Sequence, residues 1–141
     1  MYIIVRDDGV IKYSETNEID LTDLPCKAFF LEATGAIQQL NLNELTAIVN
    51  GITMPLQEQS IYILGNEPIY GEVGTEISVT FAHPELECLL EDENGRFKTR
   101  LITSTQKTFL FRKPGRYKLR TLHGVCVPLY FYISDQDVLI K

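Results

Sequence analysis

Short segments that alternate apolar and polar residues follow one another between residues 69 and 134, separated by residues typical of tight turns. The predicted strands are Ile69–Val73, Thr75–Phe81, Leu86–Glu91, Phe97–Thr103, Thr108–Arg112, Arg116–Leu122 and Val125–Ser134. The separating residues are Gly74, His83-Pro84, Asn94-Gly95, Ser104-Thr105, Pro114-Gly115 and His123-Gly124. About seven short strands at this spacing are typical of two antiparallel sheets packed face to face. The pattern therefore predicts an all-β fold with a β-sandwich in the second half of the chain.

The strand after Pro114-Gly115 shows this alternation most clearly. Tyr117, Leu119 and Thr121 are predicted to point one way, into the core, because side chains alternate across a strand. The basic residues between them are predicted to point the other way.

Residues 1–66 are also predicted to form strands and turns. Tyr2–Val5 and Val10–Tyr13 are expected to form a hairpin around Asp7-Asp8-Gly9. Further expected segments are strands at Ala28–Ala33, Ala36–Leu42 and Ser60–Leu64 and a polar loop at Ser14–Asp23. Gly65-Asn66-Glu67-Pro68 is the predicted domain boundary. We therefore expect a small N-terminal β-subdomain, residues 1–66, packed on a sandwich formed by residues 67–141.

The segment Asn43–Met54 is compatible with two structures. Leu45, Ile48, Val49 and Ile52 would share one face of a short helix. However, Asn50-Gly51 between two apolar triplets is a strong hairpin signal, and a helix of about seven residues is marginal. We favour the hairpin.

The second half of the chain resembles an immunoglobulin-like domain. Val73–Phe81 resembles the second strand of that family, Lys107–Phe111 the fifth, and Pro114–Leu119 the turn and the sixth strand. The resemblance implies that the Tyr117 hydroxyl anchors a corner of the fold. Leu119 stands where the family has its second cysteine, Val79 or Phe81 stands at the first, and the chain has no Trp. Apolar packing is thus expected to replace the disulfide, as in the disulfide-free immunoglobulin-like domains of tailed-bacteriophage virion proteins.

Cys26, Cys88 and Cys126 are few, widely spaced and flanked by apolar residues. They are expected to be buried free thiols, and a Cys88–Cys126 bridge is the alternative if their strands lie opposite each other. The first residues lack the pattern of a signal peptide, and no apolar run approaches the roughly 20 residues of a membrane helix. We therefore expect no membrane partner and synthesis in a reducing cytoplasm.

Charge is distributed unevenly along the chain. Residues 1–95 hold three basic and seventeen acidic side chains, whereas residues 96–141 hold ten basic and two acidic ones. Six basic residues alternate along two predicted strands: Arg96, Lys98, Arg100, Arg116, Lys118 and Arg120. The resemblance to an immunoglobulin-like sheet implies that these strands are near neighbours, so that the six charges, without acidic partners, form one positive patch. The alternative is the solvated outer face of an antiparallel sheet.

The last predicted strand, Val125–Ser134, is apolar on both faces. One face carries Val127, Leu129, Phe131 and Ile133, and the other carries Cys126, Pro128, Tyr130 and Tyr132. Such a strand is expected to be covered on both sides, by the N-terminal strands or by another subunit. Tyrosine is enriched at interfaces, so Tyr130 and Tyr132 join the six basic residues as predicted binding residues.

No arrangement of residues indicates catalysis. His83 and His123 lie beside turn residues, and the carboxylates of Glu91-Asp92-Glu93 are expected in a solvated turn. Neither a nucleophile motif nor a phosphate-binding loop is present. We therefore predict no catalytic residue, no metal and no cofactor.

These observations favour a non-enzymatic structural protein. We expect a bacteriophage virion component, such as a capsid decoration, tail or baseplate protein, which is oligomeric in the assembly and binds other virion proteins or copies of itself. One alternative is a mobile-element inhibitor or adaptor that binds a host protein through its acidic half. A second is a carbohydrate-binding module, which would favour exposed aromatic residues, above all Trp. An acidic chain is not expected to bind nucleic acid. The expected location is the virion, or otherwise the cytoplasm.

Overall fold

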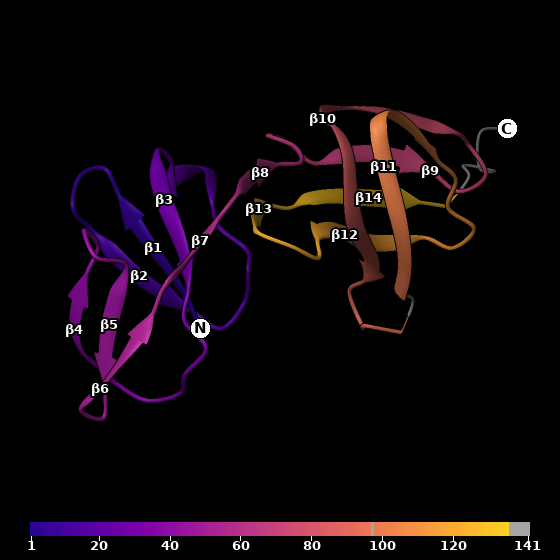
Figure 1. Cartoon of the computed structure of the whole chain (residues 1–141). Helices are drawn as coiled ribbons and strands as arrows, with labels where there is room; N and C mark the ends of the chain where they lie inside the picture. The colour runs from indigo at the N-terminus through magenta and orange to yellow at the C-terminus, as the bar shows by residue number, and fades with distance from the viewer. Residues whose placement is uncertain (97, 136–141) are drawn as a thin grey trace, which may run out of the picture. The chain divides into compact units, whose positions relative to one another are not determined.

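A computed structural model of the chain describes residues 1–96 and 98–135. The strands are β1 (Tyr2–Arg6), β2 (Ile11–Ser14), β3 (Cys26–Phe30), β4 (Ile37–Asn41), β5 (Thr46–Val49), β6 (Ile52–Pro55), β7 (Gln57–Gln59), β8 (Ile61–Ile63), β9 (Ile69–Glu72), β10 (Ile77–Asp92), β11 (Lys98–Phe109), β12 (Gly115–Thr121), β13 (Val125–Val127) and β14 (Leu129–Ser134) (Figure 1). A short 3-10 helix, η1, spans Leu21–Asp23. The fold is all-β, as the sequence predicts, and it divides into two compact units, Met1–Ile61 and Tyr62–Lys141.

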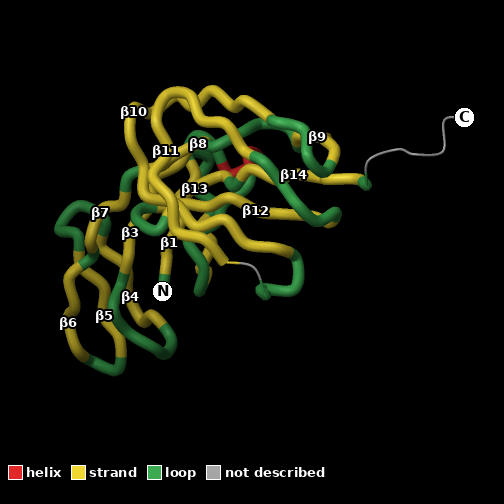
Figure 2. Tube along the Cα trace, turned by 90° about the vertical axis from the view of Figure 1, so that its right-hand side faces the viewer, coloured by secondary structure: helices red, strands yellow, loops and turns green. Residues whose placement is uncertain are grey.

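Unit 1 contains two small antiparallel sheets that share one apolar core. The first has the strand order β2-β1-β3-β7 and the second has the order β4-β5-β6. Figures 1 and 2 show β4, β5 and β6 side by side. The buried residues of this shared core come from both sheets and from the segments that link them: Ile3, Phe29, Leu31, Ala47, Val49 and Leu56. The predicted first hairpin is confirmed, with Ile3 opposite Tyr13.

The hairpin predicted at Asn50-Gly51 is also confirmed, and the alternative helix is wrong. Strand β5 pairs with β6 from Val49–Ile52 to Thr46–Pro55. Asn50 and Gly51 both have positive φ, 52° and 76°, as a two-residue type I′ turn requires. The Gly51 N–H donates a hydrogen bond to Gln38 Oε1 at 2.7 Å, which fixes the turn against β4.

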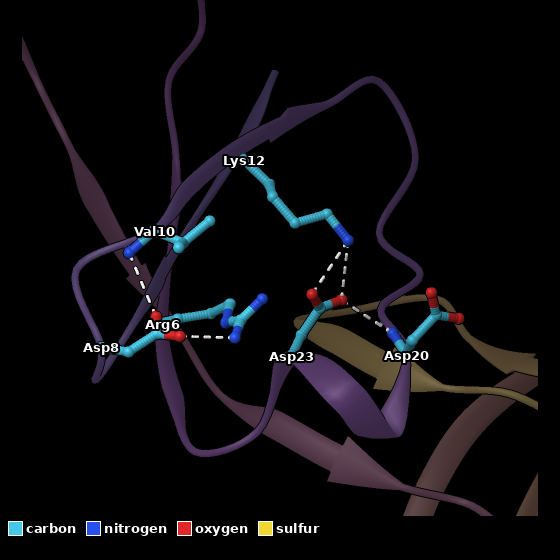
Figure 3. Close-up of polar contacts among 6 residues, drawn as sticks. All are labelled: Arg6, Asp8, Val10, Lys12, Asp20 and Asp23. Carbon is cyan, nitrogen blue, oxygen red and sulfur yellow. Dashed lines mark hydrogen bonds and ion pairs between the residues drawn. The ribbon is translucent and has the colours of Figure 1, made fainter.

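The predicted polar loop at Ser14–Asp23 ends in η1, where the Asp23 carboxylate is buried. Lys12 Nζ lies 2.9 Å and 3.1 Å from the two Asp23 oxygens, and the Asp20 N–H donates to Oδ2 at 3.0 Å (Figure 3). Burial by itself would raise the pKa of Asp23, but the hydrogen bonds and the charges of Lys12 and Arg6 outweigh it and lower the pKa. The ion pair therefore ties the loop to strand β2.

Unit 2 contains a five-stranded sheet in the order β11-β10-β12-β14-β9 and a two-stranded sheet formed by β8 and β13. Strands β10 and β11 lie side by side along their length (Figures 1 and 2). The predicted break at His83-Pro84 is wrong, because β10 continues through these residues. The pairing of β10 with β11 shifts register between Thr80 and Glu85, so the extra residues form an irregular bend within one strand. The predicted break at Ser104-Thr105 is wrong for the same reason, while Phe97, the predicted start of that strand, lies outside the described residues.

The core of unit 2 is rich in aromatic residues. Phe131 is fully buried, and its ring centroid lies 5.0 Å from that of Phe109 and 5.1 Å from that of Phe111. Tyr62 and Leu64 also pack against this core, and the Leu64 N–H donates to the Val127 carbonyl at 3.0 Å. Residues 62–64, which the sequence analysis assigned to the N-terminal part, therefore pack with unit 2.

The predicted alternation of β12 is confirmed. Tyr117, Leu119 and Thr121 are buried, whereas the basic residues between them point away from the core. The Tyr117 hydroxyl donates a hydrogen bond to the Lys113 carbonyl at 2.7 Å, the kind of upstream backbone contact that the immunoglobulin-like resemblance implied. Burial, followed by the nearby charge of Asp92, raises the pKa of Tyr117, so the hydroxyl stays protonated and able to donate.

Replacing Tyr117 with phenylalanine is expected to destabilise unit 2 by about 1 kcal/mol, because the hydrogen bond to the Lys113 carbonyl is lost while the ring remains packed. Urea denaturation followed by near-ultraviolet circular dichroism measures the change. The matched control is Tyr13→Phe, since Tyr13 is exposed in unit 1. Equal stability of the two variants would contradict a role for the hydroxyl.

The last predicted strand is two strands, interrupted at Pro128. Strand β13 pairs with β8 and is buried throughout, whereas β14 lies between β12 and β9. Proline cannot donate a backbone hydrogen bond, which suits the point where the chain changes partners. The prediction of cover on both faces is correct for β13 but wrong for β14, because Tyr130 is exposed and Tyr132 is half-buried.

The three cysteines, all within the described residues, are free thiols, so the Cys88–Cys126 bridge is not formed. Cys88 and Cys126 are buried as predicted, whereas Cys26 is only partly buried. Burial raises the pKa of the Cys88 thiol to about 11. At neutral pH this thiol is therefore protonated and unreactive.

Candidate functional site

Seven of the eight predicted binding residues lie on one face of the five-stranded sheet, which we call the outer face because it points away from the aromatic core. Strand register places the following residues on it: Lys98, Arg100 and Ile102 of β11, Glu87, Leu89 and Glu91 of β10, Arg116, Lys118 and Arg120 of β12, Tyr130 and Tyr132 of β14, and Tyr70 of β9. The eighth predicted residue, Arg96, is exposed in the turn before β11, where its N–H donates to Asp92 Oδ1 at 2.8 Å.

The two basic strands are separated by β10, which carries carboxylates on the same face. Glu91 lies opposite Lys98 on one side and opposite Lys118 on the other. Neighbouring strands lie about 4.8 Å apart, so β11 and β12 are roughly twice that distance from each other. The two basic strands are therefore close together in one sheet, but they are not adjacent.

Ion pairs connect the basic residues of both strands to β10 and to the turn after it. Arg100 Nη2 lies 2.9 Å from Glu87 Oε1, and Arg116 Nε lies 3.7 Å from Glu93 Oε2. Lys118 Nζ and Arg120 Nε each lie 3.5 Å from Glu91 Oε1. The predicted positive patch without acidic partners is thus wrong, because the acidic segment that precedes β11 in sequence folds between the basic strands.

This arrangement also changes the meaning of the uneven charge along the chain. Residues 62–141 hold ten basic and ten acidic side chains, while residues 1–61 hold three basic and nine acidic ones. Unit 2 is therefore neutral as a whole, and the outer face presents rows of alternating sign. The inhibitor alternative would use the acidic side chains of residues 85–93, and three of these, Glu87, Glu91 and Glu93, already lie beside cations of the same chain.

Three tyrosines gather at one side of the outer face. The rings of Tyr70 and Tyr132 are stacked, with centroids 5.3 Å apart and planes inclined by 21°. Tyr70 is 76% exposed and Tyr130 is 36% exposed. Tyr70 was missed by the sequence analysis because only the parallel pairing of β9 with β14 brings it beside Tyr132. The alternation of Ile69–Glu72, which predicts an exposed side chain at Tyr70, was the one sequence signal for a binding role of this residue.

A groove of about 610 Å³ lies between two of these tyrosines, Tyr130 and Tyr132, and the end of β10 with the turn after it. Its lining also includes Arg116, Lys118 and residues 91–95. The turn is held by Asp92 Oδ1, which accepts hydrogen bonds from the N–H groups of Asn94 and Arg96. The groove therefore brings four predicted binding residues against a row of carboxylates.

The two histidines lie apart from this groove. His83 belongs to β10, and its ring packs edge-on against Tyr62 with a centroid distance of 4.9 Å. His123 is exposed, and its Nε2 lies 3.2 Å from Glu87 Oε2. Within residues 1–96 and 98–135, no group of three or more His, Cys, Asp or Glu side chains is arranged to hold a metal ion. The same part of the chain contains no helix long and apolar enough to cross a membrane.

Comparisons of the chain with protein-family models, with curated proteins and with solved structures find no match.

Proposed function

We propose that this protein is a non-enzymatic assembly protein that docks onto its partners through the outer face of unit 2. The observation that carries the proposal is the cluster formed by Tyr70, Tyr130 and Tyr132 beside Arg116 and Lys118. Tyrosine and arginine are enriched at protein interfaces and at their energetic centres. An exposed aromatic pair at the side of a regular sheet face is a surface suited to burial by another protein.

The rows of opposite charge on this face favour selective binding of particular partners over general electrostatic attraction of any charged protein. The cations of β11 and β12 flank the carboxylates of β10, so a partner must present charges in the complementary order. A uniformly acidic surface would oppose Glu87 and Glu91. The proposed partner therefore presents charges of both signs.

The resemblance of residues 67–141 to disulfide-free immunoglobulin-like domains supports a place in a bacteriophage virion, as a capsid decoration, tail or baseplate protein. The proposed partners are other virion proteins or copies of the same chain.

Replacing Tyr70 with alanine is expected to weaken self-association about tenfold, since one central aromatic residue contributes more than about 1 kcal/mol at many interfaces. Light scattering over a concentration series measures the association constant of the full chain. The matched control is Tyr13→Ala, an exposed tyrosine of unit 1, which is expected to associate like the wild type.

Two results would contradict the proposal. One is a wild-type chain that stays monomeric up to about 1 mM and does not co-sediment with tailed-phage particles. The other is association that Tyr70→Ala and Tyr13→Ala weaken equally. Raising the salt concentration is expected to weaken association only moderately, because the charges of this face are already paired within the chain.

A further inference from the structure

The groove on the outer face has the size and the composition of a small-molecule site. Its volume of about 610 Å³ falls within the range of roughly 300–1,000 Å³ that such sites occupy. Its lining would suit an apolar ligand poorly, because hydrogen-bond donors and acceptors alternate beside the aromatic rings. The class of ligand can therefore be argued from the chemistry of the lining.

Donors and acceptors in the groove stand in pairs. Arg116 Nε and Glu93 Oε2 are 3.7 Å apart, and Lys118 Nζ and Glu91 Oε1 are 3.5 Å apart. These distances exceed the roughly 2.7–3.2 Å of a direct N–H···O hydrogen bond. A ligand hydroxyl accepts and donates at once, so it can accept from the cation of a pair while it donates to the carboxylate. Each pair is thus complementary to a hydroxyl group.

Charged ligands fit the groove less well. A phosphate or carboxylate that approached Arg116 would also approach Asp92 and Glu93, and an ammonium group that approached Glu91 would also approach Lys118. Each would gain one favourable interaction and one unfavourable interaction at similar distance. A neutral ligand with many hydroxyls avoids this conflict.

Tyr130 and Tyr132 supply an apolar surface in the same groove. The face of an aromatic ring carries partial negative charge, and polarised C–H groups pack favourably against it. The ring of Tyr132 stacks on that of Tyr70, with centroids 5.3 Å apart, which restricts its orientation before a ligand arrives. A pyranose ring combines the two required surfaces, since it has a C–H face and a rim of hydroxyls.

We propose that this groove binds a neutral oligosaccharide. The sugar C–H faces pack on Tyr130 and Tyr132, and its hydroxyls bridge the Arg116–Glu93 and Lys118–Glu91 pairs. The groove shares Arg116, Lys118, Tyr130 and Tyr132 with the docking surface proposed above, so a saccharide and a protein partner would compete for it. The two proposals are tested separately, because docking is tested at Tyr70, which is absent from the lining of the groove, and saccharide binding is tested at groove residues.

The test is a glycan array probed with the full chain, followed by nuclear magnetic resonance titrations of the ¹⁵N-labelled chain. The titrations use lactose, maltotriose, cellotriose and chitotriose, with 3′-sialyllactose as the anionic counterpart of lactose. Binding with a dissociation constant on the order of 1 mM is expected, with amide shifts concentrated at residues 91–95 and 116–118. Lactose is expected to bind at least as tightly as sialyllactose, because the acid of the latter meets the groove carboxylates.

Two variants and one control locate the binding. Tyr132→Ala is expected to weaken binding of the tightest-binding saccharide about tenfold, and Arg116→Ala about fivefold. Tyr13→Ala is expected to leave this affinity unchanged. Amide spectra of each variant confirm that the fold is retained, and Tyr130→Ala replaces Tyr132→Ala if the latter is not folded.

The proposal is overturned if no array glycan and no titrated saccharide binds. It is also overturned if anionic saccharides bind more tightly than their neutral counterparts, or if the folded tyrosine variant binds saccharide as tightly as the wild type. Self-association that covers residues 91–95 and is not displaced by any saccharide would identify the groove as part of the protein interface instead, and would likewise overturn the proposal.

Discussion

Replacing Phe131 with alanine is expected to lower the free energy of unfolding of unit 2 by about 3–5 kcal/mol. Phe131 is 0% exposed, and its ring packs against those of Phe109 and Phe111. Alanine removes the apolar surface buried by the ring and leaves a cavity, because neighbours on paired strands move little. Domain stabilities are typically about 5–15 kcal/mol, so the loss is a large share of the total.

Urea denaturation followed by near-ultraviolet circular dichroism measures this loss. The chain has seven tyrosines and no Trp, so tyrosine signals report on the fold. Hydrogen exchange of peptides from residues 77–92 and 115–134 assigns the loss to unit 2 rather than unit 1. The matched control is Phe131→Leu, which keeps most of the volume and is expected to cost about 1 kcal/mol. A loss below about 1 kcal/mol for Phe131→Ala would contradict a tightly packed aromatic core.

Local patterns in the sequence predicted the local structure well. The Asn50-Gly51 turn needs two residues that tolerate positive φ, and few dipeptides meet this need. The alternation after Pro114-Gly115 predicted which β12 residues are buried, because side-chain direction has a period of two in any strand. In both cases, residues close in sequence are sufficient to predict the local structure.

The pairing of distant strands is where sequence reasoning failed. Nothing in the alternation of β10 shows that it lies between β11 and β12 rather than beside only one of them. The ion pairs of Glu87, Glu91 and Glu93 follow from that strand order. Five of the six basic residues share one face of the sheet, as predicted, but the carboxylates between them and the tyrosines beside them were not predicted. The charge of a sheet face depends on the order of its strands, which the residues of one strand do not encode.

The two predicted breaks inside β10 and β11 failed for a related reason. His83-Pro84 and Ser104-Thr105 look like turns when each is read alone. In the structure they face each other across paired strands, where a shift in register absorbs the irregularity. A turn signal in one strand is thus overridden when its partner strand bends at the same level.

Replacing Asp23 with alanine is expected to destabilise unit 1 by about 2 kcal/mol at neutral pH. Asp23 is 2% exposed and accepts hydrogen bonds from Lys12 Nζ and from the Asp20 N–H. Alanine removes the acceptor for both donors. The Lys12 side chain is about half exposed, so solvent screens part of the ion pair and keeps the loss below that of a fully buried pair.

The same carboxylate makes this loss depend on pH. Burial alone would raise the pKa of Asp23, but its hydrogen bonds and the charges of Lys12 and Arg6 lower the pKa in the folded state. A lowered pKa means that the folded state favours the carboxylate, so its contribution is complete above the ordinary aspartate pKa of about 3.9. The contribution is lost as the pH falls through the lower folded-state value. Urea denaturation at pH 7 and at pH 3 is therefore expected to show a smaller difference between wild type and Asp23→Ala at pH 3.

Two further variants separate charge from hydrogen bonding. Asp23→Asn keeps an oxygen acceptor near the Asp20 N–H but loses the charge, so its stability at pH 7 is expected between those of wild type and Asp23→Ala. Asp7→Ala removes an exposed aspartate from the same unit and is expected to change the stability by less than about 0.5 kcal/mol. If Asp7→Ala and Asp23→Ala lost equal stability, a general charge effect on this acidic unit would explain both. The buried ion pair between β2 and η1 would then not be what holds the loop in place.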